Sequence, residues 1–232
     1  MASNADDAPV IYLYHEGDTE LDYVQQLAKG KDIRIIKRPS VSSPHVLVQR
    51  AREYAVEQEK DLLSHPNAEI WVIFDFDSKA QAMEKVRKLW RSCPEGCKGE
   101  KSCGKDFNRC PKAEVFKRIH VAFMSPCIEL WGLMCTEQGA AQKQFSEDRH
   151  ELQRQLKKVM PNYEHSGSPR FDLSRMTQTQ TADAIRRAKG WVKTHGEFPD
   201  CLTAPHYAGI GLLVEKILTA QTLNVKDWRR RR

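Results

Sequence analysis

The sequence predicts an α/β protein built around a mainly parallel β-sheet, and three observations support this. Short apolar stretches alternate with helical segments along the first part of the chain, which is the pattern of parallel strands joined by crossover helices. One stretch, 69–77, is almost continuously apolar, as expected for a strand covered on both faces. The chain has 232 residues, so it can bury a core without disulfides or metal.

Four strands are expected. The first, 9–14, begins with a proline, is rich in β-branched and aromatic residues, and is followed by Gly17. The second and fourth strands, 33–37 and 118–125, are short apolar stretches on either side of the 69–77 strand in the sequence. With helices between them, these strands predict a three-layer core.

Helices are expected between and after these strands, because apolar residues recur there at helical spacing. Thr19 and Asp22 have the spacing of a capping box at the first helix. The predicted ranges are 18–30, 43–63, 80–90 and 126–134.

The remaining chain predicts helices only, at 145–159, 178–194 and 209–220. We therefore expect an α/β core at 9–140, interrupted by a cysteine-rich insertion at 92–112. Residues 141–232 form a helical region that packs on this core.

Composition points to an ordinary globular protein, with 40% hydrophobic and 29% charged residues. No apolar run is long enough to span a membrane. The N-terminus resembles neither a secretory signal nor a transit peptide, and the seven cysteines favour a reducing compartment, so we expect a cytoplasmic protein. The net charge of +6 is a modest excess. It includes a terminal basic run with Arg229 and Arg230, which is either a phosphate-binding tail or a solvated one.

Acidic residues gather where three of the predicted strands end. Glu16 and Glu20 follow the first strand, Asp75 and Asp77 end the third, and Glu129 lies just after the fourth. Ligand sites of open α/β sheets form beyond the carboxyl ends of the strands. These five carboxylates are therefore expected on one rim.

Asp75 and Asp77 are two residues apart, so in an extended strand both side chains point to the same side and repel each other. A cation relieves this repulsion. Carboxylate oxygens favour a hard ion such as Mg²⁺ or Mn²⁺, whose usual work is phosphate-ester chemistry. Glu20 and Glu129 also have a structural interpretation, because an acid in the first turn of a helix stabilises it by about 0.3 to 1 kcal/mol.

Four segments resemble, in order, the motifs of the RloB-like family, a branch of the Toprim fold. They are EGDTE (16–20), DFD (75–77), SPCIELWGLM (125–134) and LTAPHYAGIGLLVEKI (202–217). The chain departs from the family pattern at Ser125, at Ile128, and at Tyr207 with Ala208. These departures affect the surroundings of the acids and leave the acids themselves in place.

The resemblance implies a Toprim core in which Glu16, Asp75 and Asp77 bind Mg²⁺ or Mn²⁺ for cleavage of DNA or RNA. Glu20 matches a further acidic position, as metal ligand or general base, and Glu129 matches one that supports the site. The family is associated with anti-phage defence and often with an ABC-type ATPase. A nuclease working with such a protein partner is what the likeness implies.

The insertion contains four cysteines that suit a structural Zn²⁺ site in a reducing compartment. Two disulfides or four free thiols are the alternatives. The four are Cys93, Cys97, Cys103 and Cys110. Basic residues in the same segment suit contact with a phosphate backbone: Lys98, Lys101, Lys105, Arg109 and Lys112. The other cysteines, Cys127, Cys135 and Cys201, are expected in the core.

Two other functions stay open. The segment IFDFDSK also resembles the D-x-D strand of HAD-type phosphohydrolases, although there that motif lies on the first core strand. A non-catalytic subunit that binds nucleic acid through the basic segments is the third possibility. No G-x-x-x-x-G-K-[ST] loop occurs, so we expect no ATP hydrolysis by this chain.

Overall fold

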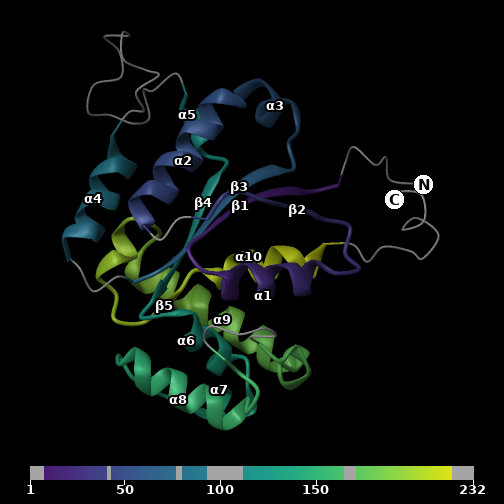
Figure 1. Cartoon of the computed structure of the whole chain (residues 1–232), viewed down its shortest axis with the longest axis vertical. Coiled ribbons are helices and arrows are strands. Elements are labelled where there is room, and N and C mark those ends of the chain that lie inside the picture. Colours follow the sequence, from purple (N-terminus) through teal and green to yellow (C-terminus); the bar gives the residue numbers. More distant parts are fainter. Residues whose placement is uncertain (1–7, 41–42, 77–79, 93–111, 165–170, 221–232) are drawn as a thin grey trace.

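The computed structural model describes residues 8–40, 43–76, 80–92, 112–164 and 171–220 (Figure 1). Its centre is a five-stranded sheet with the order β2-β1-β3-β4-β5. The first four strands of that order run parallel, and β5 is antiparallel to β4. The predicted α/β class with a mainly parallel sheet is confirmed. The strands are β1 (Val10–His15), β2 (Arg34–Lys37), β3 (Ala68–Asp75), β4 (Ile119–Ser125) and β5 (Tyr207–Ala208).

Helices cover both faces of the sheet in the described part of the chain (Figure 1). The first five are α1 (Asp18–Ala28), α2 (Pro44–Glu57), α3 (Glu59–Ser64), α4 (Ala80–Arg91) and α5 (Ala113–Phe116). The next five are α6 (Ile128–Met134), α7 (Glu137–Ala141), α8 (Arg149–Val159), α9 (Gln178–His195) and α10 (Ile210–Thr219). The described residues also form the short 3₁₀ helices η4 (Leu173–Arg175) and η5 (Asp200–Thr203).

The alternation of side chains along each strand divides the core in two. In β3, Trp71 and Ile73 pack in a cluster with residues of α1, α6, α9 and α10. Val72 and Phe74 point the other way, into a cluster with α2, α4 and α5. Because successive strand residues face opposite sides, a strand that is apolar throughout fills both clusters. Figure 1 shows the two helical layers on either side of the sheet.

Several predicted boundaries differ from the structure. The predicted helix 43–63 is two helices, because Gln58 leaves helical geometry with φ −103° and ψ 21°. This turn lets Leu62 of α3 bury its side chain. The predicted capping box is wrong: Gly17 is the N-cap of α1, and no side chain caps that end.

The helical C-terminal region also differs from its prediction. It contains β5, a strand of two residues that is too short for a hydrophobic pattern to indicate it. The predicted helix 145–159 begins at Arg149, because the side chain of Asp148 accepts hydrogen bonds from the backbone N–H groups of His150 and Glu151. None of the described helices is long and apolar enough to cross a membrane.

Arg52 anchors the chain on both sides of the cysteine-rich segment. Its guanidinium donates hydrogen bonds to the carbonyls of Leu89 and Trp90, at 2.8 and 2.7 Å, and to that of Ser92. The same group lies 5.0 Å from the centre of the Phe116 ring. The four cysteines predicted to bind zinc lie in 93–111, outside the described residues.

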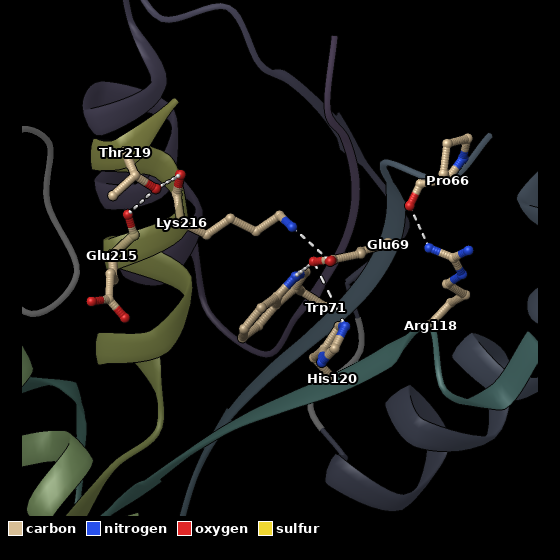
Figure 2. A network of polar contacts seen from close by, with 8 residues as sticks. All are labelled: Pro66, Glu69, Trp71, Arg118, His120, Glu215, Lys216 and Thr219. Carbon is tan, nitrogen blue, oxygen red and sulfur yellow. Dashed lines mark hydrogen bonds and ion pairs between the residues drawn. The ribbon is translucent and has the colours of Figure 1, made fainter. Parts of the chain in front are cut away.

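A polar network at the amino end of β3 attaches α10 to the sheet (Figure 2). The carboxylate of Glu69 accepts hydrogen bonds from Lys216 Nζ at 2.6 Å and from Trp71 Nε1 at 2.9 Å. His120 Nε2 lies 3.7 Å from the same carboxylate, and its ring stacks on Trp71. Burial raises the pKa of Glu69, but these donors outweigh burial and the pKa lies below its ordinary value.

We expect Glu69→Gln to destabilise the fold by about 1 to 3 kcal/mol at pH 7, because it removes charge-assisted hydrogen bonds to a mostly buried acid. Since the folded pKa of Glu69 is lowered, its contribution is present above the unfolded pKa of about 4.3 and is lost as the pH falls through the folded value. Urea unfolding at pH 7 and at pH 4 measures this.

Glu215→Gln on α10, next to Lys216, is the control, because Glu215 pairs with Lys189 at an exposed position. Its effect should stay below about 1 kcal/mol. Equal stability of Glu69→Gln and the wild type at pH 7 would contradict the assigned role.

Candidate functional site

The carboxyl ends of β1 and β3 form the base of the site. The two ends are held together because the backbone N–H of Glu16 donates to the carbonyl of Ile73 at 3.1 Å. In return, the backbone N–H of Asp75 donates to Glu16 Oε2 at 3.3 Å. The side chain of Glu16 is thereby positioned at the last residue of the middle strand of the sheet.

Glu20 comes from the first turn of α1 and is buried, with 4% of its surface exposed. Its carboxylate lies over Gly17, where an added Cβ atom would be only 2.6 Å from Glu20 Oε2. Gly17 therefore leaves the space that this carboxylate occupies. The strand-to-helix joint at 15–18 turns Glu20 back toward the sheet instead of exposing it to solvent.

Glu129 is fully buried in the first turn of α6, directly after β4. Its Oε1 accepts a hydrogen bond from the Tyr163 hydroxyl at 2.6 Å and from Gln153 Nε2 at 3.0 Å. Both donors belong to the C-terminal region. That region therefore holds a carboxylate of the site in place.

Arg149 is the first residue of α8, and its guanidinium reaches the site from the same region. Its Nη2 lies 3.2 Å from Asp75 Oδ2. The Arg149 side chain is 44% exposed and that of Asp75 is 12% exposed. The ion pair therefore joins a buried carboxylate to the solvent-facing side of the site.

The charges around Asp75 show that the acids are close together. Burial is the largest cause that raises the pKa of the Asp75 carboxyl well above its usual range, and the charges of Glu20, Glu129 and Glu16 add to it. Arg149 opposes these effects without cancelling them. Asp75 Oδ1 is buried and has no hydrogen-bond partner among the described residues. Strong perturbation of a buried acid by neighbouring acids is typical of functional sites.

Two neutral groups border the acids. Burial and the nearby charges of Glu129 and Asp75 raise the pKa of the Cys127 thiol far above its ordinary value. Burial and the nearby charge of Glu129 likewise raise the pKa of the Tyr163 hydroxyl. Cys127, Cys135 and Cys201 are free and buried, as expected of core residues, and a thiol held protonated next to carboxylates is a poor nucleophile.

His15, the last residue of β1, is fully buried. Its Nδ1 lies 2.8 Å from the carbonyl oxygen of Gly17, which assigns the ring proton to that nitrogen. Burial is the main cause that lowers its pKa. His15 is therefore a neutral residue that fixes the turn leading into α1.

Four of the five predicted acids come together: Glu16, Glu20 and Glu129 all act on Asp75. Asp77, the remaining predicted metal ligand, lies outside the described residues. In the described part of the chain, no group of three or more His, Cys, Asp or Glu side chains is arranged to share one metal ion. The chemistry of the side chains nevertheless suits a hard cation, because such ions prefer carboxylate oxygens as ligands. Asp75 presents one buried carboxylate oxygen that has no hydrogen-bond partner among the described residues.

Most of the basic residues predicted to contact nucleic acid lie outside the described residues: Lys98, Lys101, Lys105, Arg109, Arg229 and Arg230. Lys112, which is described, forms an ion pair with Glu59 of α3. This lysine therefore serves to attach the segment before α5 to the core.

Sequence reasoning missed Arg149, Gln153 and Tyr163, which contact the acids from far along the chain. Only Arg149 carries a sequence signal. A cation in the first turn of a helix faces the positive end of the helix dipole, and an arginine directly after the capping residue Asp148 is therefore unexpected. The carboxylate of Asp75 accounts for it.

A family model described as RloB-like protein matches residues 11–217, which is most of the chain. This chain belongs to the RloB-like family. No curated protein and no solved structure matches it.

In this RloB-like chain the motif segments meet around the sheet. The first follows β1, the second begins with Asp75, and the third leads from β4 into α6. The closing segment contains β5 and α10, and Gly209 N donates to the Phe123 carbonyl of β4 at 2.8 Å. A Cβ atom at Gly209 would lie 3.0 Å from the Phe123 backbone, so this close approach favours glycine.

We expect Asp75→Asn to stabilise the RloB-like chain at pH 7 in the absence of divalent cations, because it removes one charge from a repulsive cluster. A pKa unit corresponds to about 1.4 kcal/mol, so the gain should be on the order of 1 kcal/mol or more. Because the folded pKa is raised, the Asp75 carboxyl destabilises the fold increasingly as the pH rises above about 3.9. The gain should therefore vanish toward pH 4.

Urea unfolding measures this difference, with Asp183→Asn as the control because Asp183 forms an exposed helical pair with Arg186. A less stable Asp75→Asn variant at pH 7 would show that the Arg149 pair outweighs the repulsion.

Proposed function

We propose that this RloB-like protein is a divalent-metal-dependent nuclease of the Toprim type, which hydrolyses phosphodiester bonds of DNA or RNA. The observation that carries the proposal is the convergence of Glu16, Glu20 and Glu129 on the buried carboxyl of Asp75. Like charges gathered in a buried position cost stability. A cation that shares them turns this cost into a binding site, so the arrangement favours function over structural support.

The resemblance of the motifs supports the Toprim assignment. The first acidic motif lies after β1 and the second begins at the end of β3, at the same edge of the parallel sheet. That edge is where open α/β sheets bind ligands.

Glu16, Asp75 and Asp77 would hold Mg²⁺ or Mn²⁺, with Glu20 as a further ligand or the general base. When bound, the cation offsets the negative charge that develops on the phosphate. The backbone N–H of Asp75 keeps the Glu16 carboxylate at the end of β3. Tyr163 and Gln153 hold the Glu129 carboxylate, which supports the site from α6.

Hydrolysis of a phosphodiester needs two proton transfers, one to the protein and one from solvent. As general base, the Glu20 carboxylate accepts a proton from a water whose oxygen forms a new bond to phosphorus. The P–O ester bond on the opposite side breaks, and the leaving oxygen takes a proton from solvent. Burial of Glu20 near Asp75 keeps this carboxylate at the acidic cluster.

The proposal includes a role in anti-phage defence with an ABC-type ATPase partner, as the family resemblance implies. It also includes structural Zn²⁺ on the four clustered cysteines, and contact of the basic segments with nucleic acid. The anchoring of Ser92 and Phe116 by Arg52 supports an inserted module at this point of the fold.

A HAD-like phosphohydrolase is the weaker alternative, because Asp75 ends β3 instead of the first strand of the core. Turnover of a generic phosphate monoester, in preference to nucleic acid, would favour it. A non-catalytic subunit would bind nucleic acid without cleaving it under any metal.

We expect the purified chain, alone or with its ATPase partner, to cut DNA or RNA with Mg²⁺ or Mn²⁺ and to lose this activity in EDTA. Asp75→Asn and Glu16→Gln should each lower kcat by at least about 100-fold, because they remove a ligand of an ion worth several kcal/mol to the transition state. Gel assays of plasmid DNA and of structured RNA measure this.

Asp183→Asn is the control and should cleave like the wild type. Cleavage that persists in the Asp75→Asn protein would show that a different site, or a contaminant, is responsible.

Gly17→Ala tests the position of Glu20. Ala fits the backbone at this residue, which has φ −117° and ψ 164°, but its Cβ would displace the Glu20 carboxylate. We expect kcat to fall about tenfold or more, approaching the roughly 100-fold or larger loss of a general base if the carboxylate is fully displaced, while the free energy of unfolding changes by less than about 1 kcal/mol. Unchanged kcat would remove Glu20 from the proposed chemistry.

A further inference from the structure

Arg149 contacts the acidic cluster but has no role in the proposed metal site. It is a partly exposed cation that reaches a buried carboxylate of the site from outside the α/β core, with Nη2 3.2 Å from Asp75 Oδ2. Burial tends to lower the pKa of its guanidinium, but the charges of Asp75, Glu129 and Glu16 outweigh burial and raise it. Arg149 therefore lies in the field of three acids of the site.

This ion pair places Arg149 in competition with a metal ion. Asp75 has two carboxylate oxygens: Oδ2 accepts from Arg149, while Oδ1 is buried without a hydrogen-bond partner among the described residues. A divalent ion at Asp75 reduces the negative charge that attracts the guanidinium. It also repels the guanidinium directly, because both are positive.

We propose that Arg149 is a phosphate-binding residue which Asp75 holds before the metal ion arrives and which the ion releases toward the substrate. This inference rests on the proposed function, because it concerns the same site. It adds a residue that lies outside the four motif segments. It also adds an order of binding, in which the cation binds first and the nucleic acid second.

The chemistry of arginine suits this second position. A guanidinium presents several N–H donors in a planar fork that matches the oxygens of a phosphate, and it stays charged at all physiological pH values. With 44% of its side chain exposed, Arg149 has room to turn toward solvent. The same helix exposes Lys157, about 12 Å further along at 1.5 Å per residue, which adds a second cation that a phosphate backbone could contact.

This exchange of Arg149 between Asp75 and a phosphate predicts that binding of the cation and binding of nucleic acid are coupled. If the cation frees Arg149, then the cation strengthens binding of nucleic acid, and nucleic acid strengthens binding of the cation by the same factor. Removing the guanidinium should reduce this coupling to what the direct attraction between the cation and the phosphate supplies. It should also remove a competitor for Asp75.

Metal affinity is the first test and needs no catalysis. Mn²⁺ is titrated calorimetrically into the full-length wild type, Arg149→Ala and Arg186→Ala. We expect Arg149→Ala to bind Mn²⁺ about threefold to tenfold more tightly, because Asp75 loses its cationic partner. Arg186 pairs with Asp183 at an exposed position on α9, so Arg186→Ala should match the wild type.

Binding of nucleic acid is the second test. Fluorescence anisotropy of a labelled single-stranded DNA, and of an RNA of the same sequence, is measured with EDTA and with Ca²⁺, a cation chosen to occupy the site with little cleavage. We expect Arg149→Ala to weaken binding about tenfold or more with Ca²⁺, in line with loss of a charge-assisted hydrogen bond, and less than about twofold in EDTA. Arg149→Lys should restore part of the affinity.

The outcomes separate this inference from the proposed function. Weaker or unchanged Mn²⁺ binding by Arg149→Ala, or equal loss of nucleic-acid affinity with and without Ca²⁺, would overturn the exchange and leave the nuclease proposal standing. Wild-type protein that binds no Mn²⁺ would overturn both. Tighter Mn²⁺ binding together with a Ca²⁺-dependent loss of nucleic-acid affinity supports the exchange.

Discussion

The site depends on the repulsion between a buried carboxyl at the end of the middle strand and the acids around it. Asp75 is buried, and the nearby charges of Glu20, Glu129 and Glu16 raise its pKa. A protein that needed only a stable strand end would gain from an uncharged residue there. The surrounding structure is arranged to hold these charges together: Gly17 leaves room for Glu20, and the backbone of Asp75 binds Glu16.

The acids at the two ends of β3 lie in opposite electrostatic surroundings. Glu69, near the amino end, accepts hydrogen bonds from Lys216 and Trp71, and its pKa is lowered. Asp75, at the carboxyl end, has a raised pKa despite Arg149. The first acid stabilises the attachment of α10 to the sheet. The raised pKa of the second is the pattern expected where stability is exchanged for function.

The C-terminal region contributes to both ends. Lys216 of α10 neutralises Glu69, while Tyr163, Gln153 and Arg149 reach the acidic cluster. The first three motif segments supply the negative charge, and the later part of the chain supplies the groups that hold or balance it. The same region of the chain therefore contacts both Glu69 and the acidic cluster around Asp75.

Much of this arrangement follows from local sequence patterns. The apolar run before Asp75 indicates a buried parallel strand, and acids after successive strands must meet at one edge of such a sheet. The break at Gln58 could not be predicted, because no proline or glycine marks it. The strand β5 could not be predicted because two residues are too few to show a periodic pattern. The contacts of Gln153 and Tyr163 with Glu129 depend on tertiary packing, which local patterns do not encode.

The most direct test of the shared-cation site is anomalous diffraction from crystals of the chain soaked in Mn²⁺. We predict a peak within roughly 2 Å of a carboxylate oxygen of Asp75, at the edge of the sheet where β1 and β3 end. Manganese bound only elsewhere, or none bound while the Asp75 and Arg149 side chains stay paired, would contradict the metal site and the chemistry proposed for it.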